Sequence, residues 1–179
     1  MWTTVRAAVV VALCFAGCAT APETRSGRAD LEVSARATLT QMIKRDPTIA
    51  RVLDGATGYI VFPRVGEGGA IIGGAYGQGI MFERGRRVGF VKLEQAAIGA
   101  LLGGKSFSEL VVFQDRGELE DVKDGEFELR ANMDVVVLTE GAAASSTFKE
   151  GVTAFIMPIG GLMANVSIAG QRLKYVPEG

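Results

Sequence analysis

Residues 66–79 read Gly-Glu-Gly-Gly-Ala-Ile-Ile-Gly-Gly-Ala-Tyr-Gly-Gln-Gly, so seven of the fourteen positions are glycine. Glycine weakens a strand unless a bulge, a sharp bend or the close approach of another group requires the missing side chain. Glycines interleaved with apolar residues such as Ile72 and Tyr76 therefore predict tightly curved, buried strands and not a flexible linker. The run also contains Glu67 and Gln78 and no continuous apolar span of about 20 residues, which disfavours a membrane-spanning helix.

The composition indicates one globular domain. The chain has 179 residues, 48% of them hydrophobic, and a mean hydropathy of +0.25. Nineteen basic residues nearly balance 20 acidic ones, which argues against non-specific nucleic-acid binding. The sequence contains no histidine and only two cysteines, Cys14 and Cys18. The folded part therefore has neither the usual general base nor disulfide chemistry.

The first 17 residues resemble a bacterial signal peptide. Arg6 precedes a short apolar run, residues 7–16, which is too short for a typical membrane-spanning helix. The run leads to Phe15-Ala16-Gly17-Cys18, which resembles a lipobox with Phe in place of the usual Leu. This pattern predicts removal of residues 1–17 and lipidation of Cys18, and two or more acyl chains anchor a protein stably. The alternative is ordinary cleavage after Ala21, which discards Cys18.

After the signal, residues 18–29 are expected to form a lipidated, polar tether, and residues 30–179 the folded domain. Ala19 stands where many lipoproteins retained in the inner membrane carry Asp, so the sorting rule predicts the outer membrane of the cell envelope. Asp30 is the predicted cap of a helix that reaches about Lys44. This helix either packs its apolar stripe on the domain, which we favour, or lies on a membrane. A second short helix is expected over residues 46–55.

From Thr57 onwards the pattern is typical of short β-strands separated by turns rich in Gly, Asp and charge. The predicted fold is α+β, with N-terminal helices packed on a highly curved, antiparallel-rich, barrel-like β-sheet. The first strand is expected to stop at Pro63, and residues 115–117 to form a turn. Strands are expected at residues 59–62, 70–76, 79–83, 88–93, 110–113, 127–131, 135–139, 154–157, 163–168 and 173–176.

Five segments, in the same order, resemble the SYLF domain family, and most closely its bacterial lipoprotein branch. The resemblance covers roughly residues 35–176 and implies a lipid-binding domain that contacts phospholipid, with no established enzymatic activity. Lys105 stands where the family often has Gln, and residues 88–91 replace the Trp-Ser-x-Pro pattern of the eukaryotic branch. The phosphoinositide and actin binding of that branch are therefore not carried over. The matching segments are residues 59–65, 73–79, 103–107, 154–156 and 161–170.

Other motifs predict no enzyme and no cofactor. Residues 99–106 match the P-loop pattern G-x-x-x-x-G-K-[ST], but a nucleotide site requires a helix after the loop, whereas residues 107–113 are typical of a strand. We therefore expect no nucleotide. The acidic residues between Glu118 and Asp124 lack the spacing of a Ca²⁺ loop and are expected to form a solvated turn without metal. The serine hydroxyls have neither a histidine nor a suitably spaced lysine to activate them.

The clearest basic cluster is Arg84, Arg86 and Arg87 in an expected hairpin turn, with Lys92 farther along. Arginine suits lipid phosphates, although a solvated turn is the equally open alternative. We expect these cations to contact head groups, next to an apolar interior or groove lined by Ile72, Tyr76, Phe90 and Phe155. The predicted function is non-enzymatic binding of phospholipid or a membrane surface. The alternative is a structural envelope protein that binds a protein or glycan partner.

Overall fold

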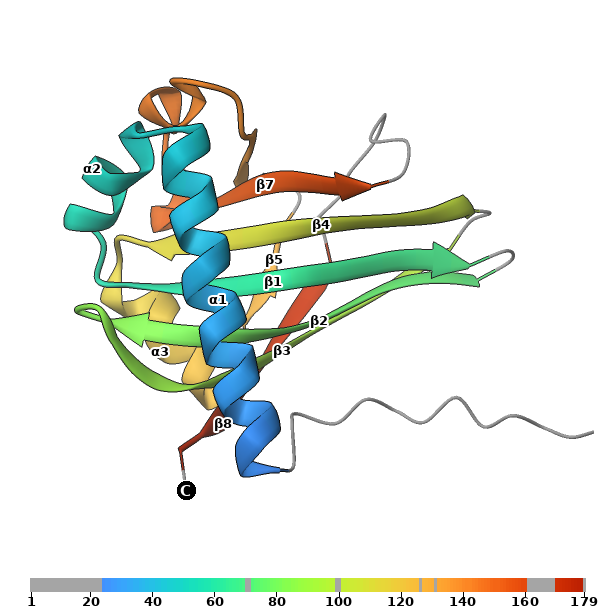
Figure 1. Cartoon of the computed structure of the whole chain (residues 1–179). Coiled ribbons are helices and arrows are strands. Elements are labelled where there is room, and N and C mark those ends of the chain that lie inside the picture. The colour runs from blue at the N-terminus through green and yellow to red at the C-terminus, as the bar shows by residue number, and fades with distance from the viewer. Residues whose placement is uncertain are drawn as a thin grey trace, which may run out of the picture.

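A computed structural model describes residues 24–69, 72–98, 101–125, 127–130, 132–160 and 170–178 (Figure 1). Its helices are α1 (Arg25–Arg45), α2 (Thr48–Asp54) and α3 (Arg116–Asp124), with 3₁₀ turns η1 (Ala142–Ser145) and η2 (Lys149–Gly151). Its strands are β1 (Gly58–Gly69), β2 (Ile72–Glu83), β3 (Arg86–Ile98), β4 (Leu101–Phe113), β5 (Glu128–Leu129), β6 (Asp134–Val137), β7 (Val152–Gly160) and β8 (Gln171–Pro177).

The strands form one sheet in the order β5-β8-β3-β2-β1-β4-β7-β6. Neighbouring strands are antiparallel except β6, which runs parallel to β7. The sheet curls into a half-barrel, with α1 and α2 on its convex face and α3 behind it (Figure 1). This arrangement confirms the predicted α+β fold with N-terminal helices on a curved, mostly antiparallel sheet.

Each face of the sheet carries its own apolar core, because successive strand residues point to opposite faces. The inner core lies on the concave face, where Phe62 and Phe107 pack with Leu119 and Val122 of α3. The outer core lies beneath α1 and α2, which contribute the buried residues Ala35, Met42 and Ile49. Burial of both faces explains why so many strand residues in this chain are hydrophobic.

The glycine-rich run forms the ends of β1 and β2, as two paired strands of the sheet. A Cβ at Gly79 would lie 2.6 Å from Cδ1 of Phe62, and one at Gly77 would lie 3.0 Å from Cγ2 of Val65. The fully buried Phe62 ring therefore rests directly on the backbone of β2. The prediction of curved strands is confirmed, and close approach occurs at Gly74, Gly77 and Gly79, whereas a Cβ at Gly66 or Gly68 would meet nothing within 4 Å.

The prediction that β1 stops at Pro63 is wrong. The strand continues to Gly69, and its register shifts between Phe62 and Val65 against β4 and between Val61 and Arg64 against β2. Proline has no N–H for the ladder, and a bulge removes the need for one. The Ser108 hydroxyl donates to the Pro63 carbonyl over 2.8 Å, which satisfies an acceptor that the bulge displaces.

Helix α1 begins earlier than predicted, at Arg25. Its cap is Thr24, whose Oγ1 accepts from the Gly27 amide at 3.1 Å, whereas the predicted cap Asp30 lies inside the helix. Residues 25–29 therefore belong to the helix and not to the predicted tether. The helix buries Ala35, Thr38 and Met42 against the sheet, so the favoured prediction of inward packing is confirmed.

Helix α3 replaces the turn predicted at residues 115–117. The Asp115 carboxylate accepts from the Gly117 amide at 2.6 Å and caps a helix that buries Leu119 and Val122. The acidic residues expected in a solvated turn are thus the solvent-facing side of this helix. The helix has only two apolar residues that face inward, Leu119 and Val122. A pattern of two residues is too short to predict a helix from sequence periodicity. The strand predicted at 163–168 lies outside the described residues.

One carboxyl group is buried inside the half-barrel. Glu109 of β4 is 0% exposed and lies on the inner face, near Gln171 of β8, although three strands separate β4 from β8 in the sheet. Burial raises the pKa of Glu109 to about 8, and the Gln171 amide opposes this rise only in part. Neither side chain completes a hydrogen bond of normal geometry. With this pKa, the protonated form of the carboxyl group predominates at pH 7.

We expect Gly79→Ala to lower the free energy of unfolding by about 2–3 kcal/mol, because the new methyl group overlaps Phe62 and the Val61 carbonyl in a packed core. Gly68→Ala is the matched control: a Cβ there meets nothing within 4 Å, so the change should stay within about 0.5 kcal/mol. Urea denaturation of both variants checks this. Equal effects would contradict the close approach of Phe62.

We expect the unfolding free energy to fall as the pH rises from about 4.5 to about 8. In this window the unfolded chain loses the Glu109 proton while the folded chain retains it. Glu109→Gln should remove most of this slope and stabilise the protein at pH 8 by roughly 2–4 kcal/mol. Urea denaturation across this pH range is the measurement, with the exposed Glu140→Gln as control. Parallel curves for Glu109→Gln and the wild type would show that Glu109 is charged when folded.

Candidate lipid-binding groove

An open groove of about 540 Å³ lies between the first half of α1 and the convex face of β1 and β2. Leu31 and Ser34 line it from the helix, and Pro63, Arg64, Tyr76 and Gln78 line it from the strands. The Gln78 amide donates to the Tyr76 hydroxyl at 3.0 Å, which orients both side chains at the groove. The strands extend beyond α1, so this part of the convex face has no helix over it (Figure 1).

Local backbone features form this groove. The bulge in β1 places both Pro63 and Arg64 on the convex face, while Phe62 and Val65 on either side enter the inner core. Gly66 also lines the groove, and a Cβ there would meet nothing within 4 Å. A larger residue at position 66 would therefore occupy the open space and not the protein core.

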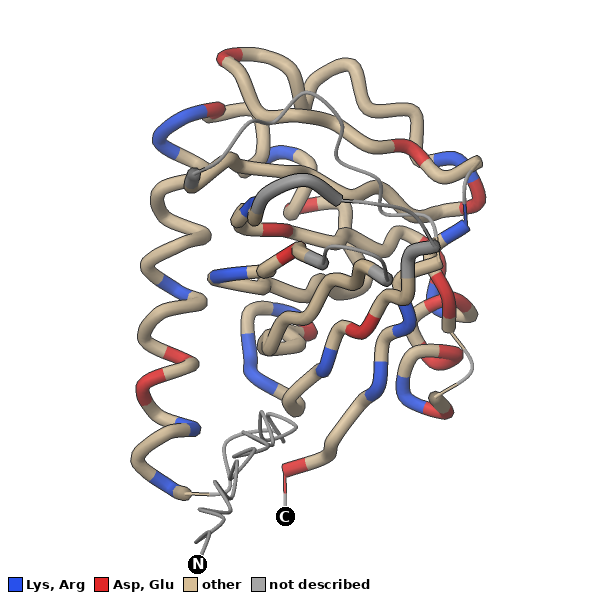
Figure 2. Tube along the Cα trace, turned by 90° about the vertical axis from the view of Figure 1, so that its right-hand side faces the viewer, with Lys and Arg blue, Asp and Glu red and all other residues tan. Residues whose placement is uncertain are grey.

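Next to the groove, strand register places a row of cations across the convex face. Arg64 of β1 pairs with Gln78 of β2, Gln78 pairs with Lys92 of β3, and Lys92 pairs with Lys174 of β8. Residues directly opposite one another in antiparallel strands share a face and lie about 5 Å apart at Cβ. We call Arg64, Lys92 and Lys174 the basic row. Figure 2 shows basic positions on several neighbouring strands, interspersed with acidic ones.

The basic row is only partly neutralised. Lys174 Nζ lies 2.5 Å from Glu94 Oε2, and Arg64 donates to the Ser106 hydroxyl at 3.3 Å. Lys92 has no ion pair within the described part of the chain. In the next row, Arg172 pairs with Glu128 at 3.2 Å and lies opposite Glu94, so that row has one more acidic than basic residue. The surface beside the groove therefore keeps a net positive charge.

The structure brings together two of the predicted site residues, Tyr76 in the groove and Lys92 in the basic row. Ile72 lies in β2 opposite Ile98, but its side chain is not among those described. Phe90 and Phe155 are 3% and 0% exposed, in the outer core. These two rings therefore belong to an apolar interior and do not line the surface groove, because α1 and α2 cover that part of the sheet.

The arginine cluster lies elsewhere. Arg84 and Arg86 are exposed at the predicted hairpin between β2 and β3. Seven residue steps along β2, or roughly 23 Å, lead from Tyr76 to Glu83 at the start of this hairpin. Arg87 lies 2.5 Å from Glu32 of α1 and also pairs with Glu178, while its guanidinium sits 5.5 Å from the Phe90 ring centroid. It fastens α1 and the C-terminal segment to the sheet. The hairpin and the groove are thus separate surfaces.

Sequence reasoning missed Arg64, Lys174 and Leu31. Arg64 follows a proline that suggested the end of a strand, and Lys174 lies about 80 residues from Lys92, its cross-strand neighbour. Alternation within each strand gives the face of a residue, but the sequence contains no signal for the register between distant strands.

The P-loop-like segment has the structure expected of a strand. Lys105 and Ser106 lie inside β4, whose residues continue as a strand to Phe113. Within the described ranges no cluster of three or more His, Cys, Asp or Glu side chains has a metal-binding arrangement. Nor does any described helix combine the length and apolarity needed to cross a bilayer. No protein-family model matches the chain, and no curated protein is significantly similar to it.

Proposed function

We propose that this protein is a non-enzymatic lipoprotein of the bacterial cell envelope, anchored through Cys18 in the outer membrane, that binds a phospholipid surface. The observation that carries the proposal is an apolar groove directly beside a row of cations on the uncovered part of the convex face. The resemblance to the lipid-binding SYLF domain supports the same function.

The groove lies within reach of the predicted anchor. Seven residue steps connect Cys18 to Arg25, which span at most about 25 Å. Six further residues of α1, or about 9 Å, lead to Leu31 at the groove. A chain anchored at Cys18 can therefore bring the groove and the basic row to the surface of the same membrane.

The two parts of this surface suit the two parts of a phospholipid. The Arg64 guanidinium offers planar donors to a phosphate, and Lys92 and Lys174 add compact positive charge. The groove has the size of typical small-molecule sites, about 300–1,000 Å³, and Leu31, Pro63 and the Tyr76 ring give it apolar walls. The proposal assigns the phosphate to the basic row and part of one acyl chain to the groove.

We expect the double variant Arg64→Gln/Lys92→Gln of residues 19–179 to bind vesicles of phosphatidylethanolamine and phosphatidylglycerol about 30-fold more weakly. Each cation near an anionic surface contributes about 1 kcal/mol, and 2 kcal/mol corresponds to this factor. Sedimentation with vesicles at low salt measures the binding. Higher salt should reduce the difference, because it screens exposed charges.

The matched control is Arg116→Gln/Lys149→Gln, which removes two exposed cations that lie outside the groove and the row. It should bind vesicles nearly as the wild type does. If Arg84→Gln/Arg86→Gln weakens binding more than the row variant does, the head-group surface is the β2–β3 hairpin. If neither pair matters, the head-group role of these cations is wrong.

The groove itself can be tested with a single tryptophan. The natural chain has only Trp2, so Tyr76→Trp in residues 19–179 gives a protein whose one tryptophan lines the groove. We expect its fluorescence to be quenched by vesicles whose acyl chains carry bromine. Tyr175→Trp, on β8 outside the groove, is the control and should not be quenched. Equal quenching at both positions would contradict insertion of an acyl chain in the groove.

The alternative, an envelope protein that binds a protein partner, has one observation in its favour. The edge strand β6 exposes Val135 and Val137, which are 38% and 51% exposed. An apolar edge strand is a surface to which another strand can add. This alternative becomes the better one if the chain binds no vesicles and neither tryptophan is quenched.

A further inference from the structure

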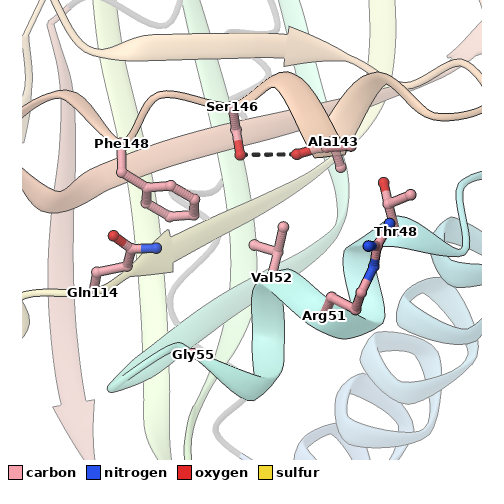
Figure 3. A pocket seen from close by; sticks show the side chains of 9 residues that line it. Thr48, Arg51, Val52, Gly55, Gln114, Ala143, Ser146 and Phe148 are labelled. Atoms are coloured by element: carbon pink, nitrogen blue, oxygen red, sulfur yellow. Dashed lines mark hydrogen bonds between the residues drawn. The ribbon is translucent and has the colours of Figure 1, made fainter.

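A second pocket, of about 320 Å³, lies at the other end of the domain, between α2, the end of β4 and the segment after β6 (Figure 3). Arg51 and Val52 of α2 line one side, and Gln114, Ser146 and Phe148 line the other. Among the described residues that line it, Arg51 is the one that carries a charge. The pocket is therefore electrostatically suited to an anion, and its walls combine an aromatic ring with amide and hydroxyl groups.

The two sides of this pocket are held together by one buried carboxylate. Asp46 is 0% exposed, and it accepts from the amide and hydroxyl of Thr48 at 3.0 and 2.6 Å and from the Ala143 amide at 2.6 Å. Burial raises the pKa of Asp46, but these hydrogen bonds outweigh it and leave the pKa below its usual value. The carboxylate thus ties the start of α2 to η1, so the pocket is built before any ligand arrives.

Phe148 reaches the pocket through an unusual backbone conformation. Its φ is 46° and its ψ 54°, a left-handed conformation that costs on the order of 1 kcal/mol for a residue other than glycine. Glu150 has a φ of 54° in the same segment. Such strained residues occur most often at functional sites. In Figure 3 the Phe148 ring points into the pocket, toward Val52, and presents an apolar side to it.

The polar groups at the pocket are available to a ligand. The Arg51 guanidinium and the Gln114 side-chain amide have no hydrogen bond or ion pair within the described part of the protein, and both side chains are exposed. Ser146 donates its hydroxyl proton to the Ala143 carbonyl at 2.9 Å, which leaves the Ser146 oxygen free to accept. The lining thus offers an amide and an acceptor near the Phe148 ring and a cation on the far side of Val52, where Arg51 extends toward Thr48 (Figure 3).

The position of the pocket separates it from the proposed lipid surface. Helix α1 runs from Arg25 to Arg45, about 30 Å, and α2 follows directly at its far end (Figure 1). The pocket and the groove therefore lie at opposite ends of α1 and share no lining residue.

We propose that this pocket binds a small saccharide that carries a carboxylate. Arg51 pairs with the carboxylate, Gln114 donates to a hydroxyl, and the Ser146 oxygen accepts from another. The Phe148 ring packs on the apolar C–H face of the sugar. This proposal is independent of lipid binding, because it uses none of the residues of the groove or the basic row.

The test uses the full chain purified from cell envelopes in detergent, with glucuronate as the probe and glucose as its matched neutral sugar. Saturation-transfer NMR measures the dissociation constant of each. We expect glucuronate to bind at least about tenfold more tightly than glucose, because an arginine–carboxylate pair is charge-assisted. Arg51→Gln should abolish this preference, and Phe148→Leu should weaken both sugars. Arg172→Gln, on β8, should leave both unchanged.

Three results would overturn the proposal. These are equal binding of glucuronate and glucose, glucuronate binding that Arg51→Gln does not change, and displacement of glucuronate by equimolar acetate. The last would show a site for simple anions. Vesicle binding by residues 19–179 with Arg51→Gln, measured in parallel, separates this outcome from a failure of the lipid proposal, since that binding should stay at the wild-type level.

Discussion

The contact on which the rest of this structure depends is that of the Phe62 ring with the backbone of β2. The ring occupies the space in which a side chain at position 79 would stand, while a Cβ at position 77 would meet Cγ2 of Val65 at 3.0 Å. Phe62 and Val65 belong to the inner core, in which α3 buries Leu119 and Val122. This core also fixes the bulge that follows Phe62, because Val65 must return to it. Gly77 and Gly79 are thus required by neighbouring side chains, whereas a Cβ at Gly66 or Gly68 would meet only open space.

The same bulge shapes the outer surface. Two consecutive residues, Pro63 and Arg64, face the convex side, and one of them brings a positive charge to the groove. Helix α1 covers only part of this side, because the strands extend beyond it (Figure 1). The uncovered strands then present the basic row. The proposed lipid surface lies where β1 bulges and where the strands extend beyond α1.

The two proposed sites lie at opposite ends of helix α1. The groove lies near the first turns of the helix, on the side of the predicted anchor, and the pocket with Arg51 and Phe148 lies beyond its last turn. Arg87 forms an ion pair with Glu32 in the first part of α1. Asp46, which directly follows α1, accepts a hydrogen bond from the Ala143 amide of η1. Both ends of α1 are therefore held on the domain by polar contacts, and the two proposed sites share no residue.

Much of the fold follows from the sequence alone. Residue alternation, glycine density and the periodicity of residues 31–43 determine a helix packed on a curved, mostly antiparallel sheet, and the turn residues determine the β2–β3 hairpin. The sequence also determines Tyr76 and Lys92 as surface candidates. It does not determine that helices cover Phe90 and Phe155, because this depends on the part of the sheet against which α1 and α2 pack. Nor does it determine the row from Arg64 to Lys174, or the meeting of Glu109 with Gln171. Only the tertiary structure decides these, since register and curl arise from packing between residues far apart in the chain.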